Sequence, residues 1–162
     1  LIMPKLKKKK DNNKISLDSK HDETHCKQYK DDVLLEFGCI TSHDGYSFDA
    51  LRACQRNHPD VMEQFMDLVI TISKSNWREL GSRGKRTKGG FETLYYSELH
   101  CSIVENYWKE TNKKFSKDKK IHVFRFGSGD RYRMIGYKSN KCSRAFHILA
   151  FDLDHSLYNH GN

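Results

Sequence analysis

The sequence predicts an α+β fold of two layers, with helices on one face of an antiparallel β-sheet and the other face left partly open. Three observations indicate this class. A compact apolar run starts near residue 33, an apolar stripe with helical spacing follows it, and three strand-like segments come in quick succession after residue 120. The 162 residues contain no internal repeat and have room for one domain.

The first half of the predicted domain supplies one strand and the helices. Residues 33–40 are apolar and end at a turn-rich Ser-His-Asp-Gly segment, which is typical of a strand. Residues 46–54 fit either a short helix or an irregular segment. Residues 59–73 open with proline and then repeat apolar side chains every three or four positions, which predicts an amphipathic helix. Residues 75–81 predict a short second helix, capped by Ser or Asn and ended by glycine.

The second half is expected to supply a carboxyl-terminal β-meander. Residues 91–96 look strand-like, residues 100–108 fit a strand or an amphipathic helix equally, and residues 113–120 form a charged linker. Three strands then follow, joined by a glycine-containing turn and by a polar turn, at residues 121–126, 131–138 and 144–152.

The net charge of +8 is unevenly spread along the chain. Residues 81–144 hold sixteen Lys and Arg against six Asp and Glu, whereas residues 32–80 hold four against eight. This asymmetry favours a polyanionic partner, with nucleic acid first, although a solvated basic face is the alternative. Residues 1–31 are Lys-rich and poor in apolar side chains, so we expect a disordered basic arm before a single domain at 32–162.

The cysteines indicate a reducing compartment. The five cysteines are scattered, odd in number and never form C-x-x-C, which argues against a disulfide framework and a zinc knuckle. No apolar run approaches the roughly eighteen residues that span a membrane, and the Lys-rich start lacks the apolar segment of a secretory signal. We therefore expect a cytoplasmic protein with no membrane partner.

Three arginines on the predicted hairpin are candidates for binding phosphate. Arg125 alternates with phenylalanines on one strand, and Arg131 and Arg133 share a face of the next. A guanidinium group offers paired donors and stays charged, which suits a phosphate group. Cross-strand ion pairing is the structural alternative.

Polar side chains also follow the last predicted strand. His155 could act as a general acid or base near neutral pH. Tyr158 could stack on a base, or move a proton if nearby arginines lowered its pKa. Asp152, Asp154 and His160 could complete a metal site with His155, or the whole segment could simply finish the sheet edge. We expect no metal ion and no cofactor. Among the remaining histidines only His147, on the last strand, is a secondary candidate.

A glycine-rich basic loop separates the helices from the later strands. Residues 81–90 lack the order of a nucleotide-binding loop, so we reject an NTPase function. The loop either contacts an RNA backbone or is a solvated connector, and its candidate RNA-binding residues are Arg83, Lys85, Arg86 and Lys88.

The order of these segments resembles the RelE/HigB/ParE superfamily of bacterial toxins. The similarity covers residues 59–80 and 121–160, through the hairpin FRFGSGDRYRMIGYK, the strand FHILAFD and the ending HSLY. The Tyr-Arg pair at 132–133 matches the pair on the family's hairpin, and His155 and Tyr158 match its terminal His or Arg and Tyr. The ending is also similar to an uncharacterised group of small bacterial and phage proteins that end in Asp-x-Asp-His-x-x-Tyr.

The resemblance implies a RelE-like fold and a toxin that cleaves RNA without a metal. The RNA 2′-hydroxyl would attack the adjacent phosphate while the three arginines stabilise its charge, with acid-base help from His155 or Tyr158. It also implies mRNA, in some members on the ribosome, and an antitoxin protein as partners. This chain departs from the family in its amino-terminal arm and in an added stretch near 91–120. The alternatives are a non-catalytic nucleic-acid-binding or regulatory protein of phage or mobile-element origin, and a metal-dependent nuclease.

Overall fold

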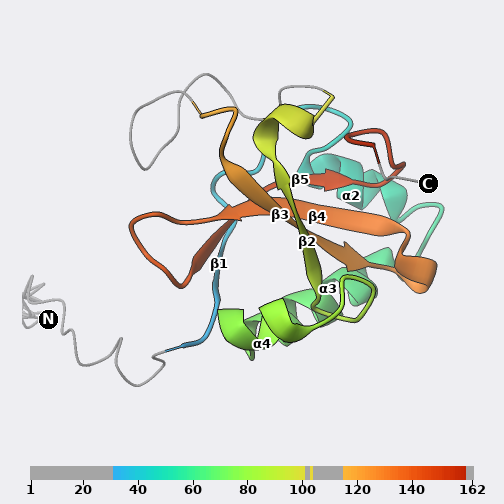
Figure 1. Cartoon of the computed structure of the whole chain (residues 1–162). Coiled ribbons are helices and arrows are strands. Elements are labelled where there is room, and N and C mark those ends of the chain that lie inside the picture. The colour runs from blue at the N-terminus through green and yellow to red at the C-terminus, as the bar shows by residue number, and fades with distance from the viewer. Residues whose placement is uncertain (1–30, 101–102, 104–114, 160–162) are drawn as a thin grey trace, which may run out of the picture. The chain divides into compact units, whose positions relative to one another are not determined.

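The computed structural model describes residues 31–100, 103 and 115–159, which belong to one compact unit, Asp31–Asn162. Within them the chain forms a five-stranded sheet and three α-helices (Figure 1). In order, the elements are β1 (Leu34–Glu36), α2 (Phe48–Cys54), α3 (Val61–Ser73), α4 (Trp77–Ser82), β2 (Phe91–Tyr95), the 3-10 turn η1 (Tyr96–Glu98), β3 (Lys120–Phe126), the 3-10 turn η2 (Ser128–Asp130), β4 (Tyr132–Lys138) and β5 (Ala145–Asp152). Three parts of the sequence-based predictions lie outside the described residues: residues 1–30 of the expected arm, most of the ambiguous stretch 100–108, and His160.

The α+β class is confirmed, but the sheet is mixed and not wholly antiparallel. Its strand order is β1-β5-β4-β3-β2. Strands β2 to β5 pair antiparallel with their chain neighbours, whereas β1 pairs in parallel with β5 along three residues, Leu34–Glu36. The prediction of an antiparallel sheet is therefore wrong for β1, whereas the carboxyl-terminal strands β3, β4 and β5 do pair antiparallel in sequence order. Two parallel strands need a long connection between them. The chain between β1 and β5 contains the three helices and the other three strands.

The cap of α4 lies where the sequence predicts it, whereas α3 begins at Val61, two residues after the proline expected in its first turn. Asn76 precedes α4, its side chain accepts from the Glu79 N–H at 2.9 Å, and Glu79 returns a bond to the Asn76 N–H. This reciprocal capping box satisfies two amide groups at the helix start. Residues 46–54, which fitted two interpretations, form α2 after the Ser47 side chain caps the Ala50 N–H. Among the described residues, every helix is too short or too polar to cross a membrane.

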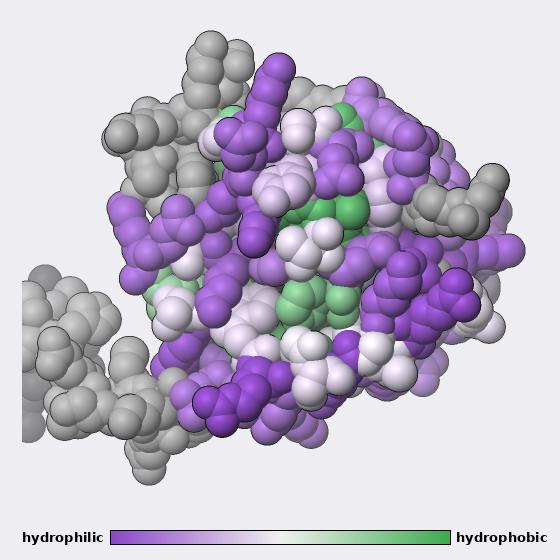
Figure 2. All heavy atoms as spheres, in the orientation of Figure 1, coloured by the Kyte–Doolittle hydropathy of each residue, from purple (hydrophilic) through white to green (hydrophobic). Residues whose placement is uncertain are grey.

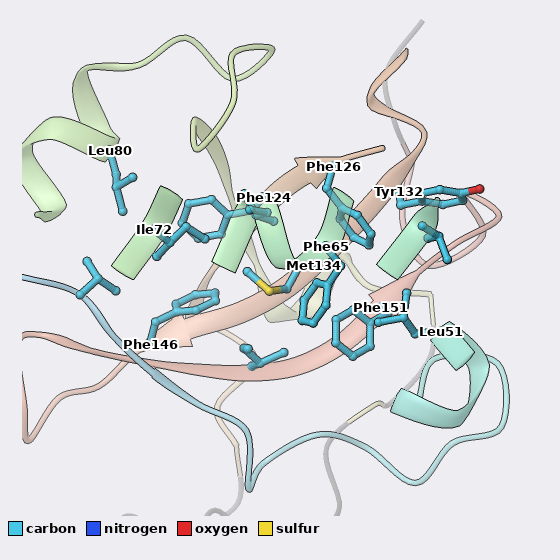
Figure 3. Close-up of a cluster of buried hydrophobic side chains, with 14 residues drawn as sticks. Leu51, Phe65, Ile72, Leu80, Phe124, Phe126, Tyr132, Met134, Phe146 and Phe151 are labelled. Atoms are coloured by element: carbon cyan, nitrogen blue, oxygen red, sulfur yellow. The ribbon is translucent and has the colours of Figure 1, made fainter. Parts of the chain in front are cut away.

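The three helices cover one face of the sheet. Strands β3, β4 and β5 turn aromatic and aliphatic side chains toward them, and Phe65 of α3 lies edge-on to Phe151 with ring centroids 5.4 Å apart (Figure 3). The apolar stripe of α3 is buried as its spacing predicted, at Val61, Phe65, Leu68 and Ile72. Burial of such side chains is worth about 2 kcal/mol each, which fixes the helices on this face.

The opposite face is also buried, contrary to the expectation of a partly open face. A second apolar cluster covers it, built from Ile121, Val123, Ile135 and Tyr137 of the sheet and from non-helical segments. Those segments contribute Leu99, Ile103, Phe115, Leu157 and Tyr158. The carboxyl-terminal segment after β5 thus covers this face of the sheet, and its Tyr158 contacts the charged residues described below.

We predict that His122 makes the protein less stable in mild acid. Burial, together with the charges of Lys138, Lys119 and Lys120, lowers the pKa of His122 on β3 to about 4. Between about pH 6.5 and 4, His122 therefore binds a proton in the unfolded state but not in the folded state. Unfolding free energy should fall by on the order of 3 kcal/mol over this window, as measured by urea denaturation.

The variant His122→Gln should show a flatter pH dependence in the same window. The exposed His43 is the matched control, and His43→Gln should behave as the wild type. Equal pH slopes for wild type and His122→Gln would contradict the assignment.

Candidate active site

A row of charged side chains crosses four strands at one end of the sheet. The register sets Arg125 of β3 directly opposite Arg133 of β4, and Arg133 directly opposite Asp152 of β5. Glu92 on β2 lies diagonally from Arg125, because its direct partner is Val123. All four side chains lie on the face of the sheet that carries the second apolar cluster. Across the strands their order is acid, base, base, acid.

Glu92 is the centre of this cluster. Its Oε1 accepts hydrogen bonds from Arg125 Nη2 at 3.2 Å and from the Tyr158 hydroxyl at 2.7 Å. Lys85 Nζ from the basic loop lies 3.8 Å from its Oε2. The side chains of Glu92 and Arg125 are 17% and 12% exposed, so the ion pair is mostly desolvated but open to solvent on one side.

The pKa values of the acid and the phenol move in opposite directions. Burial by itself would raise the pKa of Glu92, but the Tyr158 hydrogen bond and the charges of Arg125 and Lys85 lower it below the ordinary value. Burial and the bond to Glu92 raise the pKa of Tyr158 well above its usual range. Proton transfer by Tyr158 would need the opposite shift, so this residue orients Glu92 and stays protonated.

Arg133 is an internal residue. It is 3% exposed, its Nη1 donates to the Tyr132 carbonyl at 3.2 Å, and its guanidinium lies beside the Tyr158 hydroxyl. Ion pairing across strands, the structural alternative for these arginines, is found for Arg125 with Glu92. Arg133 reinforces the same cluster from the neighbouring strand.

The Asp-x-Asp-His segment after β5 is a turn. Both Asp152 oxygens are engaged, accepting the Ser156 N–H at 3.1 Å and the Leu157 N–H at 3.4 Å. Asp154 accepts from the backbone and side chain of Ser156. These bonds place Tyr158 over the sheet. The conceivable metal set of Asp152, Asp154, His155 and His160 is therefore not assembled among the described residues, which exclude His160.

Arg131 and His155 form a separate pair beside the row. Arg131 is exposed and caps η2, so it lies just before β4 and not in the strand. His155 has the left-handed φ of 65°, uncommon for a residue other than glycine, and its Nε2 donates to the Arg131 carbonyl. This bond fixes the imidazole ring beside the residue that precedes β4.

The basic loop has a structural and a solvent-facing part. Arg83 Nη2 donates to the Ser75 hydroxyl at 3.0 Å and its Nη1 to the Lys88 carbonyl at 3.4 Å, so this residue holds the loop against the helices. Lys88 pairs with Asp67 of α3 at 2.9 Å. Arg86 is exposed and, in the described part of the chain, forms no ion pair. Contact with RNA stays a prediction for this loop.

The loop and the arginine row meet at a pocket of about 280 Å³. Strand β2 starts at Phe91 opposite Phe124, so Arg125 and Phe126 extend past it and face this opening. The pocket lining comprises Gln64, Asp67, Leu68, Lys88, Arg125, Phe126, Gly127 and Ser128. The molecular face seen in Figure 1 is mostly hydrophilic around a small apolar area (Figure 2). Lys88 and Arg125 both line this pocket, and each is paired with an acid, Lys88 with Asp67 and Arg125 with Glu92.

Glu92 was missed in the sequence analysis although a signal for it exists. Alternation along β2 places Glu92 on the same side as Leu94, which packs into the second apolar cluster. An acid that shares the inward face of a strand, in a segment with sixteen bases and six acids, indicates a buried ion pair. Its partner could be named only once the strand pairing was known.

We predict that Tyr158→Phe destabilises the protein by about 2 kcal/mol, since it removes a hydrogen bond to a desolvated carboxylate. It should also raise the pKa of Glu92, because this bond stabilises the charged form. Urea denaturation and a side-chain NMR titration measure the two effects. Tyr95→Phe, at a position 49% exposed, is the control and should change neither quantity. Wild-type stability in Tyr158→Phe would contradict the proposed contact.

No protein-family model matches this chain, and neither a curated protein nor a solved structure is significantly similar to it.

Proposed function

We propose that this protein is a metal-independent endoribonuclease. The observation that carries the proposal is the Glu92 carboxylate held 3.2 Å from Arg125 and 2.7 Å from Tyr158, with Arg133 on the adjoining strand. A carboxylate that stays ionised at neutral pH can accept a proton, and guanidinium groups beside it can neutralise a phosphate. These are the two requirements of RNA cleavage through its own 2′-hydroxyl.

In this mechanism Glu92 is the general base. It takes the proton of the RNA 2′-hydroxyl as the 2′ oxygen bonds to the adjacent phosphorus. The bond from phosphorus to the 5′ oxygen breaks, and that oxygen takes a proton from His155. The products are a 2′,3′-cyclic phosphate and a free 5′-hydroxyl. Arg125 stabilises the charge that builds on the phosphate oxygens, and the buried Arg133 supports the cluster from the neighbouring strand.

Phosphate binding would itself prepare Glu92 for this role. In the structure Arg125 lowers the pKa of Glu92 by pairing with it. A phosphate that draws Arg125 away would weaken this pairing and raise the proton affinity of the carboxylate. Arg125 Nε supports the exchange, because it is buried and has no hydrogen-bond partner among the described residues. An unsatisfied guanidinium donor is uncommon and suits an incoming anion.

The RelE-like resemblance of the sequence extends the proposal to a toxin of a toxin-antitoxin system. Its substrate would be mRNA, free or on the ribosome, and its regulator a cognate antitoxin protein. Lys85, Arg86 and Lys88 would contact the RNA backbone beside the pocket, and such contacts weaken as salt is raised. The test of ribosome dependence compares the cleavage of free RNA with the cleavage of RNA on translating ribosomes.

We predict that Glu92→Gln lowers RNA cleavage at least about 100-fold, the usual contribution of a general base. The amide keeps the shape of the side chain and its bond from Tyr158 but cannot take the proton. Cleavage is measured by primer extension, with and without ribosomes and in the presence of a chelator, and the ends are tested for cyclic phosphate. Glu63→Gln on the exposed side of α3 is the matched control and should retain full activity.

Each other result selects another function. Full cleavage by Glu92→Gln would refute the general base, and loss of cleavage with chelator would favour a metal-dependent nuclease. Salt-dependent RNA binding by the wild type with no cleavage in either setting would establish the non-catalytic binding protein.

We predict that His155→Ala loses activity on RNA but not on a uridine 3′-phosphate ester with a good aryl leaving group. A nitrophenolate leaves without a proton, so only the natural 5′ oxygen needs the general acid. His43→Ala at an exposed position serves as control and should keep both activities. Equal losses on the two substrates would assign His155 to folding or binding and not to proton donation.

A further inference from the structure

A second cluster of reactive side chains lies at the other end of the same sheet face. The parallel register sets Glu36, the last residue of β1, directly opposite His147 of β5. The chain turns after β1 and brings Cys39 back to the same point. Arg133 and Tyr137, which mark the two ends on β4, are four residues or roughly 13 Å apart. The two clusters are therefore distinct.

The three side chains direct one potential ligand atom each at a shared position. His147 Nδ1 lies 2.8 Å from Glu36 Oε2 and 3.7 Å from Cys39 Sγ. The three atoms all lie within 4.8 Å of one another, and among the described residues this is the group that could hold a metal ion. The His147 side chain is 12% exposed and that of Glu36 41%, so solvent reaches the cluster from one side.

Neighbouring groups fix the orientation of two of these side chains. The Gly38 N–H donates to the other carboxylate oxygen, Glu36 Oε1, at 2.7 Å. The His147 ring stacks on Tyr137 with centroids 4.8 Å apart and planes inclined by 16°. Supporting contacts of this kind turn metal ligands toward their ion and commonly improve affinity.

We propose that Glu36, Cys39 and His147 form a binding site for a zinc-class divalent cation. A thiolate, an imidazole and a carboxylate are a ligand set that suits Zn²⁺. Zn–S and Zn–N bonds of about 2.3 and 2.0 Å in tetrahedral geometry put the ligand atoms about 3.3–3.6 Å apart. The observed 3.7 Å from Sγ to Nδ1 fits this, and Oε2 must withdraw from Nδ1 by about half an ångström. Binding releases the thiol proton of Cys39 to solvent, and the proton that His147 Nδ1 donates to Glu36 must leave this nitrogen for solvent or for Nε2.

The bound ion would fasten β1 to the sheet. Strand β1 is an edge strand joined to β5 by three register pairs, and Cys39 extends the contact beyond its end. A cation that binds the folded chain alone stabilises it by mass action. The fourth tetrahedral position would be taken by solvent or by an external ligand, since the chain supplies three.

The test titrates the full chain, freed of metal, with Co²⁺ and then Zn²⁺. We expect one Co²⁺ per chain, a thiolate-to-metal absorption band in the near ultraviolet, and displacement by Zn²⁺ with a rise in melting temperature. Cys39→Ser should lose the band and at least about tenfold in affinity. Cys142→Ser, at an exposed cysteine away from the cluster, is the matched control and should keep both.

Circular dichroism of each metal-free variant checks that it folds, and His147→Gln supplies a second, independent loss of a ligand. Absence of the band in the wild type would overturn the proposal. So would a band that survives in Cys39→Ser, because the sulfur ligand would then be another cysteine. Weakening by Cys142→Ser equal to that by Cys39→Ser would likewise refute the site.

Discussion

The direct opposition of Arg125 and Arg133 in neighbouring antiparallel strands is the constraint on which the rest of the structure depends. Like charges in this position destabilise a sheet unless acids flank them. Glu92 on one side and Asp152 on the other provide that balance. Each acid in turn fixes a further segment, since Glu92 binds Tyr158 and Asp152 binds the turn that leads to it. One pair of arginines is thus connected through two acids to the carboxyl-terminal segment, and the row spans four strands.

A charged row of this kind is a poor means of stabilising a fold. Desolvating charges costs several kcal/mol per ion, and hydrophobic side chains of the same volume often serve equally well. The second apolar cluster already covers most of this face with aliphatic and aromatic side chains. The retention of two guanidinium groups and a carboxylate in its midst is better explained by chemistry than by stability, and groups with shifted pKa values concentrate at functional sites. The partial exposure of Glu92 and Arg125 is consistent with this explanation.

Most of the fold could be predicted from patterns among neighbouring residues. Most of the candidate site could not, because it depends on pairing between strands far apart in the sequence. The stripe of α3 and the Asn76 cap of α4 are read within a few residues, so these helices were predicted nearly to their ends. Strands β3 to β5 were predicted for the same reason, because turn residues separate them. The parallel pairing of β1 with β5 depends on contacts between residues more than a hundred positions apart. The register shift between Ile135 and Gly136 depends on how β4 pairs with β5. Glu92 and the Glu36–His147 pair became visible only through that pairing.

The cluster around Glu92 and the cluster of Cys39 and His147 share a sheet face, but their proposed roles have different physical requirements. Between them lie Ile135 and Val123, whose apolar side chains leave no polar path along the strands. The cleavage proposed for Glu92 would need only proton transfer and positive charge, whereas the cation proposed for Cys39 and His147 would act on the attachment of β1. Removing that cation would loosen an edge strand that three other strands separate from β2. The proposed cleavage without a metal is therefore compatible with the proposed metal site, because the sheet holds the two clusters at opposite ends of one face.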